Sequence, residues 1–192
     1  MTATDPPAQR IAGLTNREAP LWVRALFALQ RRRYGVVLEP TRLWARAPAA
    51  LRGFVDLFAG TDRAASPLEP PLRSLVMVRV SQINACSYCV DINASFLLER
   101  GISTEKALAV ADHETSEAFS EKERAALTFA VEMTETGPGV SDATFFALRE
   151  HFSDDEIVEL TALVAMQNAS SKFNAALRIP PQGFCPALRP AQ

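Results

Sequence analysis

The chain has 192 residues and a formal net charge of -2, with 48% of residues hydrophobic and 22% charged. This composition suits one compact domain and excludes a disordered, collagen-like or disulfide-scaffold protein, because apolar content is ample and three cysteines cannot cross-link so long a chain. The N-terminus has no secretory signal pattern, and no apolar run approaches the ~18 residues of a membrane span. We therefore expect a cytoplasmic protein without a membrane partner, in which a close cysteine pair indicates redox or metal chemistry.

The N-terminal region carries few signals of its own. Residues 1–17 are predicted to form a flexible arm, and Trp22, Phe27 and Leu29 follow at helix-like spacing. We expect these side chains to pack on the core or across subunits rather than to bind a ligand. Three arginines at 31–33 then close a helix-like stretch, where cations are favoured, and their charge alone does not indicate a nucleic-acid partner.

The middle of the chain favours helices joined by short turns, since residues 72–136 contain no proline and a single glycine, Gly101. The prolines at 70–71 are predicted to start a helix over the Val-rich segment 75–80, because no second strand-like run exists for that segment to pair with. Gly101 is expected to end the following helix in the left-handed conformation, and Ser103 to cap the next one.

Two capping boxes, Ser120 with Glu123 and Ser153 with Glu156, predict the starts of two amphipathic helices. No internal repeat or glycine-rich phosphate loop interrupts this pattern. We therefore predict an all-α fold, an antiparallel multi-helix bundle. The expected organisation is a single domain over residues 18–179, with its core motif at 72–101, and an irregular tail over 180–192.

The most informative motif is the cysteine pair Cys86 and Cys89. Residues three apart on a helix lie about 5–6 Å apart, close enough to form a disulfide. A zinc site would need two further ligands, and the candidates Cys185, His113 and His151 are scattered without a second paired motif, so the histidines are interpreted as surface or cap residues. A dithiol needs only the pair. Redox chemistry without a metal or cofactor is therefore the favoured interpretation, and two inert buried thiols are the alternative.

A helix unbroken from Arg79 to Asn93 would place Arg79, Gln82, Cys86, Cys89 and Asn93 on one stripe. Arg79 could then stabilise a thiolate and Asn93 could hydrogen-bond Cys89, although both could also be plain surface or interface residues. Cys86 would be the more acidic thiol, because it is nearer a predicted helix start.

Residues 72–91, LRSLVMVRVSQINACSYCVD, closely resemble the core of the alkylhydroperoxidase D and carboxymuconolactone decarboxylase family. The similarity extends through residues 120–130 and 167–174, and spans roughly 40–180. It implies an all-α fold that assembles as a homo-oligomer, a trimer or hexamer, with the cysteine pair near a subunit interface. It also implies that Cys89 attacks a hydroperoxide to become a sulfenic acid and that Cys86 resolves it as a disulfide.

The chain departs from this family at the proton relay. The family's peroxidase has a glutamate twelve residues before the first cysteine and histidines just before and four after the second. Here these positions hold Ser74, Tyr88 and Asn93, none of which is a base near neutral pH. Tyr88 could donate a hydrogen bond to a substrate oxygen or simply pack. Asp91 points around the helix from Cys89, so it could act only through water or a neighbouring subunit.

The leading hypothesis is a thiol-dependent oxidoreductase that reduces a hydroperoxide or exchanges disulfides, using a thiol reductant. The first alternative is a carboxymuconolactone decarboxylase-like lyase, in which arginines hold substrate carboxylates and the cysteines are not required. The second is a non-enzymatic, redox-sensing helical oligomer. Cys185, in the tail, is either a spare thiol or a third redox partner of the pair.

Overall fold

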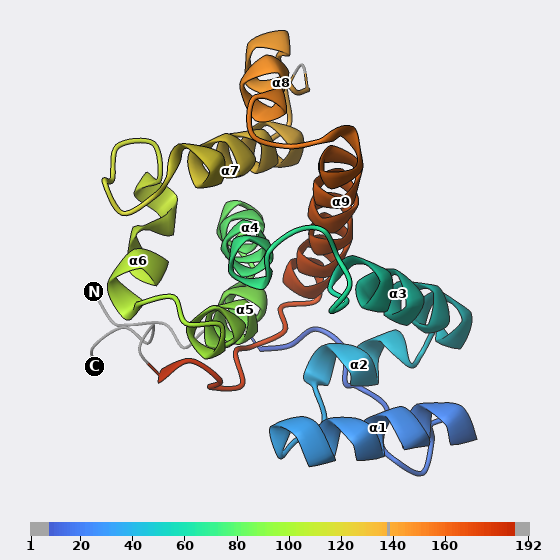
Figure 1. Ribbon diagram of the computed structural model, residues 1–192. Coiled ribbons are helices and arrows are strands. Elements are labelled where there is room, and N and C mark those ends of the chain that lie inside the picture. The colour runs from blue at the N-terminus through green and yellow to red at the C-terminus, as the bar shows by residue number, and fades with distance from the viewer. Residues whose placement is uncertain (1–7, 138, 187–192) are drawn as a thin grey trace.

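The structure is a computed structural model that describes residues 8–137 and 139–186, and every regular element within them is a helix (Figure 1). This confirms the all-α prediction. No helix in these ranges is both long and apolar enough to cross a membrane. The α-helices are α1 (Leu21–Tyr34), α2 (Glu39–Trp44), α3 (Pro48–Thr61), α4 (Pro70–Ile83), α5 (Ser87–Glu99), α6 (Thr104–Leu108), α7 (Glu121–Thr134), α8 (Asp142–Arg149) and α9 (Asp154–Ala176), with the 3-10 helix η1 (Ala109–Asp112) after α6.

Helix α4 is the centre of the molecule and packs against α5, α7 and α9 (Figure 1). Its residues Leu75 to Val78 have no exposed surface, so the helix is covered on every side. A helix buried all round needs apolar residues at successive positions instead of an amphipathic stripe. This explains why the Val-rich segment resembles a strand in sequence although it is helical.

The predicted helix boundaries are largely confirmed. Pro70 occupies the first turn of α4, and Ser120 and Ser153 each form both halves of a capping box with the glutamate three residues on. Gly101 lies just beyond α5 with φ 87°, and the side chain of Ser103 caps α6. These features are local, because each depends on residues within one turn of the helix end.

The prediction of an unbroken helix from Arg79 to Asn93 is wrong. Helix α4 ends in a Schellman motif, in which the N–H of Cys86 donates to Ser81 O (3.0 Å) and that of Ala85 to Gln82 O (3.0 Å). Ala85 has φ 50°, a left-handed conformation that usually requires glycine. The chain reverses there, and Cys86 becomes the N-cap of α5. Helices α4 and α5 therefore form a hairpin with the cysteine motif at its turn.

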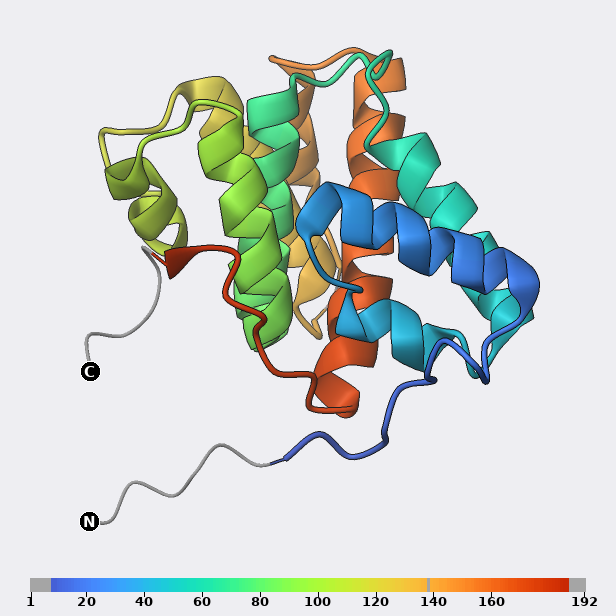
Figure 2. The same cartoon turned by 90° about the horizontal axis from the view of Figure 1, so that it is seen from below.

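The N-terminal helices form a layer against α9, with α3 packing on α9 and α2 on α3 (Figure 2). Phe27 is fully buried and Trp22 packs beside it, as expected, whereas Leu29 is 62% exposed. The arginines at 31–33 occupy the last turn of α1, as predicted. Of the predicted arm, residues 8–17 run along the domain, where Arg10 N–H donates to Leu177 O (3.1 Å), and residues 1–7 lie outside the described residues.

The C-terminal segment runs beside α5 without regular structure (Figure 2). It is held by the buried carboxylate of Asp91, which accepts hydrogen bonds from the backbone N–H groups of Gln182, Gly183 and Phe184 on Oδ2 and of Cys185 on Oδ1, at 2.7–3.1 Å. Charge-assisted bonds of this kind are about twice as strong as neutral ones. Asp91 therefore fixes this segment next to the cysteine motif.

A buried ion cluster ties α3 to the α4–α5 hairpin. The carboxylate of Asp62, just after α3, lies 3.2 Å from Nε of Arg73 and 2.7 Å from a guanidinium nitrogen of Arg100. The side chains of Arg73 and Asp62 are 3% and 8% exposed, so these charges are largely desolvated. Removing one partner of such a group leaves uncompensated buried charge.

We predict that Asp62→Ala lowers the free energy of unfolding by about 3–5 kcal/mol, because it leaves two arginines without their carboxylate. Urea unfolding followed by circular dichroism measures the change. The matched control is Arg149→Ala, whose pair with Asp154 is exposed on both sides and should contribute at most about 1 kcal/mol. Equal losses in the two variants would contradict this assignment.

Candidate active site

The cysteine pair sits at the first turn of α5. Cys86 is the N-cap, and its Sγ accepts a hydrogen bond from the backbone N–H of Cys89 at 3.2 Å. Both thiols are free and buried, with exposed fractions of 3% and 2%. An N-cap side chain normally supplies oxygen to the free amides of the first turn. Here sulfur takes that role, and the electropositive end of the helix favours its thiolate form.

The two thiols have opposite acidities. A hydrogen bond from the Cys89 thiol, together with the Cys89 N–H, lowers the pKa of Cys86 below its ordinary value. The hydrogen bond to Cys86 and burial both raise the pKa of Cys89. Cys86 therefore ionises first, as its place at the helix start predicts, and Cys89 keeps its proton as the donor of the pair.

Helix α9 supplies the polar environment of Cys89. The side-chain amide of Asn174 donates to Cys89 Sγ at 3.1 Å, and Ser170, one turn earlier, also hydrogen-bonds this sulfur. Asn174 is 1% exposed, and its Oδ1 has no hydrogen-bond partner within the described residues. These donors favour a negative charge on Cys89, in opposition to burial and to Cys86.

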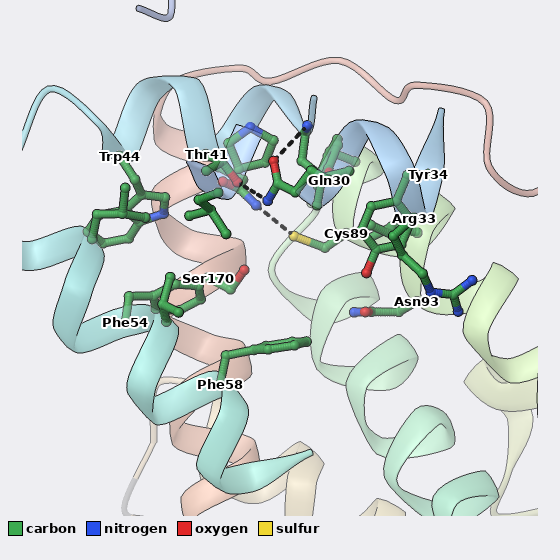
Figure 3. Close-up of a pocket in the computed structure, with 18 of the residues that line it drawn as sticks. Gln30, Arg33, Tyr34, Thr41, Trp44, Phe54, Phe58, Cys89, Asn93 and Ser170 are labelled. Atoms are coloured by element: carbon green, nitrogen blue, oxygen red, sulfur yellow. Dashed lines mark hydrogen bonds between the residues drawn. The ribbon is translucent and has the colours of Figure 1, made fainter. Parts of the chain in front are cut away.

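Cys89 lies on the wall of a cavity of about 420 Å³ (Figure 3). Side chains of α1, α2, α3, α5 and α9 enclose it, and much of the wall is aromatic. Trp44 stacks between Phe54 and Phe173, with ring centroids 5.2 and 3.9 Å away. A concave apolar space with few polar groups is typical of a site for an organic ligand.

The polar side chains around this cavity are held in place by one another. Gln30 donates to Thr41 Oγ1 (2.8 Å) and accepts the N–H of Leu38 (3.2 Å), and Figure 3 shows this bridge above Cys89. Lower down, the side-chain amides of Asn93 and Gln167 both donate to the hydroxyl of Ser81, at 3.1 and 3.0 Å. The wall is thus organised before any ligand binds, a feature that lowers the entropic cost of binding.

Cys86 opens onto a different cavity. This second cavity, of about 690 Å³, lies among the end of α4, the start of α5 and the C-terminal segment. Its lining includes Cys86 but not Cys89, whereas the first cavity is lined by Cys89 but not Cys86. Cys185 also borders the second cavity and is buried, and no disulfide joins any of the three cysteines, all of which lie in the described part of the chain.

Two of the predicted supporting residues lie beside the pair. Tyr88 is 3% exposed and lines the first cavity, with its ring edge-on to Phe184. Burial raises the pKa of Tyr88, so the phenol stays protonated, and its Oη has no partner among residues 8–137 and 139–186. Asn93 also lines this cavity, but it bonds Ser81 and not Cys89.

The other three candidates provide no base to the thiols, although Asp91 lines the second cavity with Cys86. Ser74 accepts a hydrogen bond from Arg100 at 2.8 Å, and the carboxylate of Asp91 is occupied by the C-terminal segment. Arg79 acts on His113: burial and the charge of Arg79 both lower the pKa of His113. Arg79 is absent from the described lining of both cavities. The relay positions thus carry no base near the pair.

The histidines do not form a metal site. His113 is the C-cap of η1, in agreement with its interpretation as a cap residue, although it is buried at 1% exposure, and His151 is exposed. Within the described ranges, no group of three or more His, Cys, Asp or Glu side chains is arranged to hold a metal ion.

The sequence-based prediction missed most of the first cavity. Gln30, Thr41, Trp44 and Phe54 come from helices far from the motif in sequence, and no local pattern marks them as ligand-binding. The helices α1–α3, which were expected to pack rather than to bind a ligand, also form a wall of the cavity. Asn174 had one signal, its place in the segment 167–174 that resembles the family pattern.

The comparisons with known proteins agree with this arrangement. The profile described as the carboxymuconolactone decarboxylase family matches residues 48–132, from the start of α3 into α7. The chain is 45% identical over 167 residues to the uncharacterized protein YnjA of Escherichia coli (strain K12), covering 86% of this chain and 91% of that relative.

Solved structures share the fold. A peroxidase-related protein from Ralstonia eutropha JMP134, described as an alkylhydroperoxidase AhpD core, is 24% identical with a TM-score of 0.83, covering 93% of this chain and 95% of that one. The apo debrominase Bmp8 is 21% identical with a TM-score of 0.79, covering 91% and 92%. At these identities the likeness establishes the AhpD-like helical fold.

We predict that the first thiol of the protein titrates below the ordinary cysteine pKa of ~8.5 and the second above it. A lower pKa means more thiolate at neutral pH, so absorbance near 240 nm should show an early step below this value. Cys86→Ser should remove the early step, because Cys89, the remaining thiol of the pair, is buried. Cys185→Ser is the control and should retain it. An early step that survives in Cys86→Ser would contradict the assignment of the acidic thiol.

Proposed function

The chain belongs to the carboxymuconolactone decarboxylase family, and on this premise we propose that it is a thiol-dependent oxidoreductase that reduces organic hydroperoxides. Cys89 is the attacking thiol, and Cys86 is first its proton acceptor and then its resolving partner. One observation carries the proposal: Cys86 Sγ accepts a hydrogen bond from the Cys89 N–H, and Cys89, but not Cys86, borders an aromatic cavity.

In the proposed first step, Cys86 is the base that the relay positions lack. The Cys89 thiol passes its proton to the Cys86 thiolate while Cys89 Sγ attacks the terminal oxygen of the hydroperoxide. The O–O bond breaks, and the departing alkoxide takes the proton from Cys86 and leaves as an alcohol. Cys89 is then a sulfenic acid and Cys86 is again a thiolate. General-base assistance of this kind contributes ~100-fold to 10,000-fold in rate.

In the second step, the Cys86 thiolate attacks the sulfenic sulfur of Cys89. The sulfur–oxygen bond breaks, hydroxide leaves and takes a proton to become water, and a Cys86–Cys89 disulfide forms. The hydrogen bond from the Cys89 N–H to Cys86 Sγ supports this step, because it holds Cys86 Sγ at the helix turn that carries Cys89. A thiol reductant must then restore the dithiol.

The cavity supports an organic substrate rather than hydrogen peroxide alone. Its space of about 420 Å³ would accommodate a molecule with a ring or a branched chain, and the stacked rings of Trp44 and Phe54 offer it apolar surface. The unpartnered Oη of Tyr88 and Oδ1 of Asn174 supply one donor and one acceptor beside Cys89. A hydroperoxide group can use both.

We expect Cys89→Ser to abolish consumption of cumene hydroperoxide in a single turnover without reductant, because no thiol then borders the aromatic cavity. Cys86→Ser should oxidise at least about 100-fold more slowly at pH 7, since it lacks the proton acceptor, and should recover part of its rate at high pH. It should also stop at the sulfenic acid, which dimedone trapping and mass spectrometry detect.

The matched control is Cys185→Ser, which should oxidise at the wild-type rate. Hydroperoxide consumption that persists in Cys89→Ser would overturn the proposal. A reaction on a lactone substrate that survives loss of both thiols would instead support the lyase. A reversible Cys86–Cys89 disulfide without turnover would support the redox sensor.

A further inference from the structure

The cysteine pair borders two cavities, and each thiol borders only one of them. Cys89 lines the aromatic cavity, whereas Cys86 lines the second cavity beneath the C-terminal segment. The second cavity has a different chemical character, because its described lining contains no aromatic side chain and includes Gln82, Asp91 and Gln182. Its rim includes Ala85 and Ser87, which are exposed to solvent.

We propose that the dithiol is served from two sides: the oxidising substrate reacts with Cys89 in the aromatic cavity, and a hydrophilic dithiol reductant enters the second cavity and attacks Cys86. This inference rests on the proposed function for the identity of the oxidant, but it makes a separate claim about the disulfide. It assigns the second cavity as a binding site for the reductant.

Disulfide chemistry makes the side of approach decisive. A thiolate attacks one sulfur of a disulfide, that sulfur forms the new bond, and the other sulfur leaves with the electron pair. A reductant in the second cavity meets Cys86, so the first product is a mixed disulfide on Cys86 with a Cys89 thiolate. The second thiol of the reductant then attacks the reductant sulfur that is bonded to Cys86. The Cys86 thiolate is released, and the reductant leaves as its own disulfide. Two electrons pass to the protein, and the two thiol protons of the reductant complete the balance.

Leaving-group acidity would favour the opposite attack, because the more acidic thiol leaves faster and Cys86 has the lower pKa in the resting dithiol. That preference for attack at Cys89 weakens when the reductant attacks Cys86. The first cause of the raised pKa of Cys89 is its hydrogen bond to Cys86, which is lost when Cys86 is bonded to the reductant. The amide of Asn174 still donates to Cys89 Sγ and stabilises the departing thiolate. The side from which the reductant can reach the disulfide then determines which sulfur it attacks.

The arrangement keeps the two half-reactions from competing for one space. A hydrophilic dithiol has little to gain in the aromatic cavity, where burial of polar groups without partners is unfavourable. An apolar substrate or its product can remain against Trp44 and Phe54 while Cys86 is reduced from the other side. The two cavities thus let the oxidant and the reductant bind at separate places, so that they do not compete for one thiol.

The test uses the full chain with its disulfide formed by diamide, so that it does not depend on hydroperoxide activity. Ser87→Trp narrows the second cavity at its rim, and Val55→Trp narrows the first. Reduction by dithiothreitol is quenched with N-ethylmaleimide and followed by mass spectrometry. We expect Ser87→Trp to reduce at least tenfold more slowly than wild type and Val55→Trp to reduce at the wild-type rate.

Val158→Trp, at an exposed position of α9 outside the lining of both cavities, is the control for a bulky surface substitution. If Ser87→Trp does not fold, Val90→Trp narrows the same cavity. Slower reduction in Val55→Trp with an unchanged rate in Ser87→Trp would overturn the proposal, as would equal rates in all variants. Failure of cumene hydroperoxide to oxidise the protein would count against the proposed function alone, because diamide supplies the disulfide here.

Discussion

The hydrogen bond from the backbone N–H of Cys89 to Cys86 Sγ is the interaction on which the rest of the site depends. It exists only because α4 stops at Ile83 and α5 starts at Ser87, which leaves a free amide for a sulfur atom to accept. In an unbroken helix the amide of Cys89 would bond a backbone carbonyl, and neither thiol would sit at an electropositive helix end. The break therefore gives two otherwise similar cysteines different acidities and makes them line different cavities.

Two helix ends carry backbone strain next to this interaction. Ala85 after α4 and Arg178 after α9 both have positive φ, at 50° and 54°, although neither is glycine. Such residues persist where the surrounding structure holds them, and they concentrate at functional sites. One of these ends presents Cys86, and the other terminates the helix turn that presents Asn174 to Cys89.

What the sequence predicted well is what short-range chemistry determines. The prolines at 70–71, the capping boxes at Ser120 and Ser153 and the glycine at 101 act within one turn, so the helices they bound were predictable. The break at Ala85 was not, because alanine carries no signal for a left-handed residue and the helical pattern continues on both sides. Its cause is tertiary, in the packing of two helices that fold back on each other.

The same distinction applies to the site. Cys86 and Cys89 stand out because their chemistry is in their side chains and their spacing is local. The first cavity depends on contacts between segments more than 40 residues apart, such as Trp44 against Phe173, and no window of sequence contains both. The family resemblance brought the cysteine pair and the 167–174 segment to attention, but the helices α1 and α2 lie outside the matched residues 48–132. Part of the cavity wall therefore lies outside the residues that the family profile matches.

Asp91 has a consequence for how this protein can change over evolutionary time. Its carboxylate contacts only main-chain amides of the segment it holds, so this anchor does not depend on which side chains residues 182–185 carry. Gly183, at φ 81°, is the one position where backbone conformation restricts the choice. A substitution at Gln182 would lose the side-chain hydrogen bonds to Glu39 and Val37, yet it would alter the shape and charge of the space beside Cys86 without any loss of the anchor. A surface that can change while its anchor is kept is a simple route by which related proteins could acquire different redox partners.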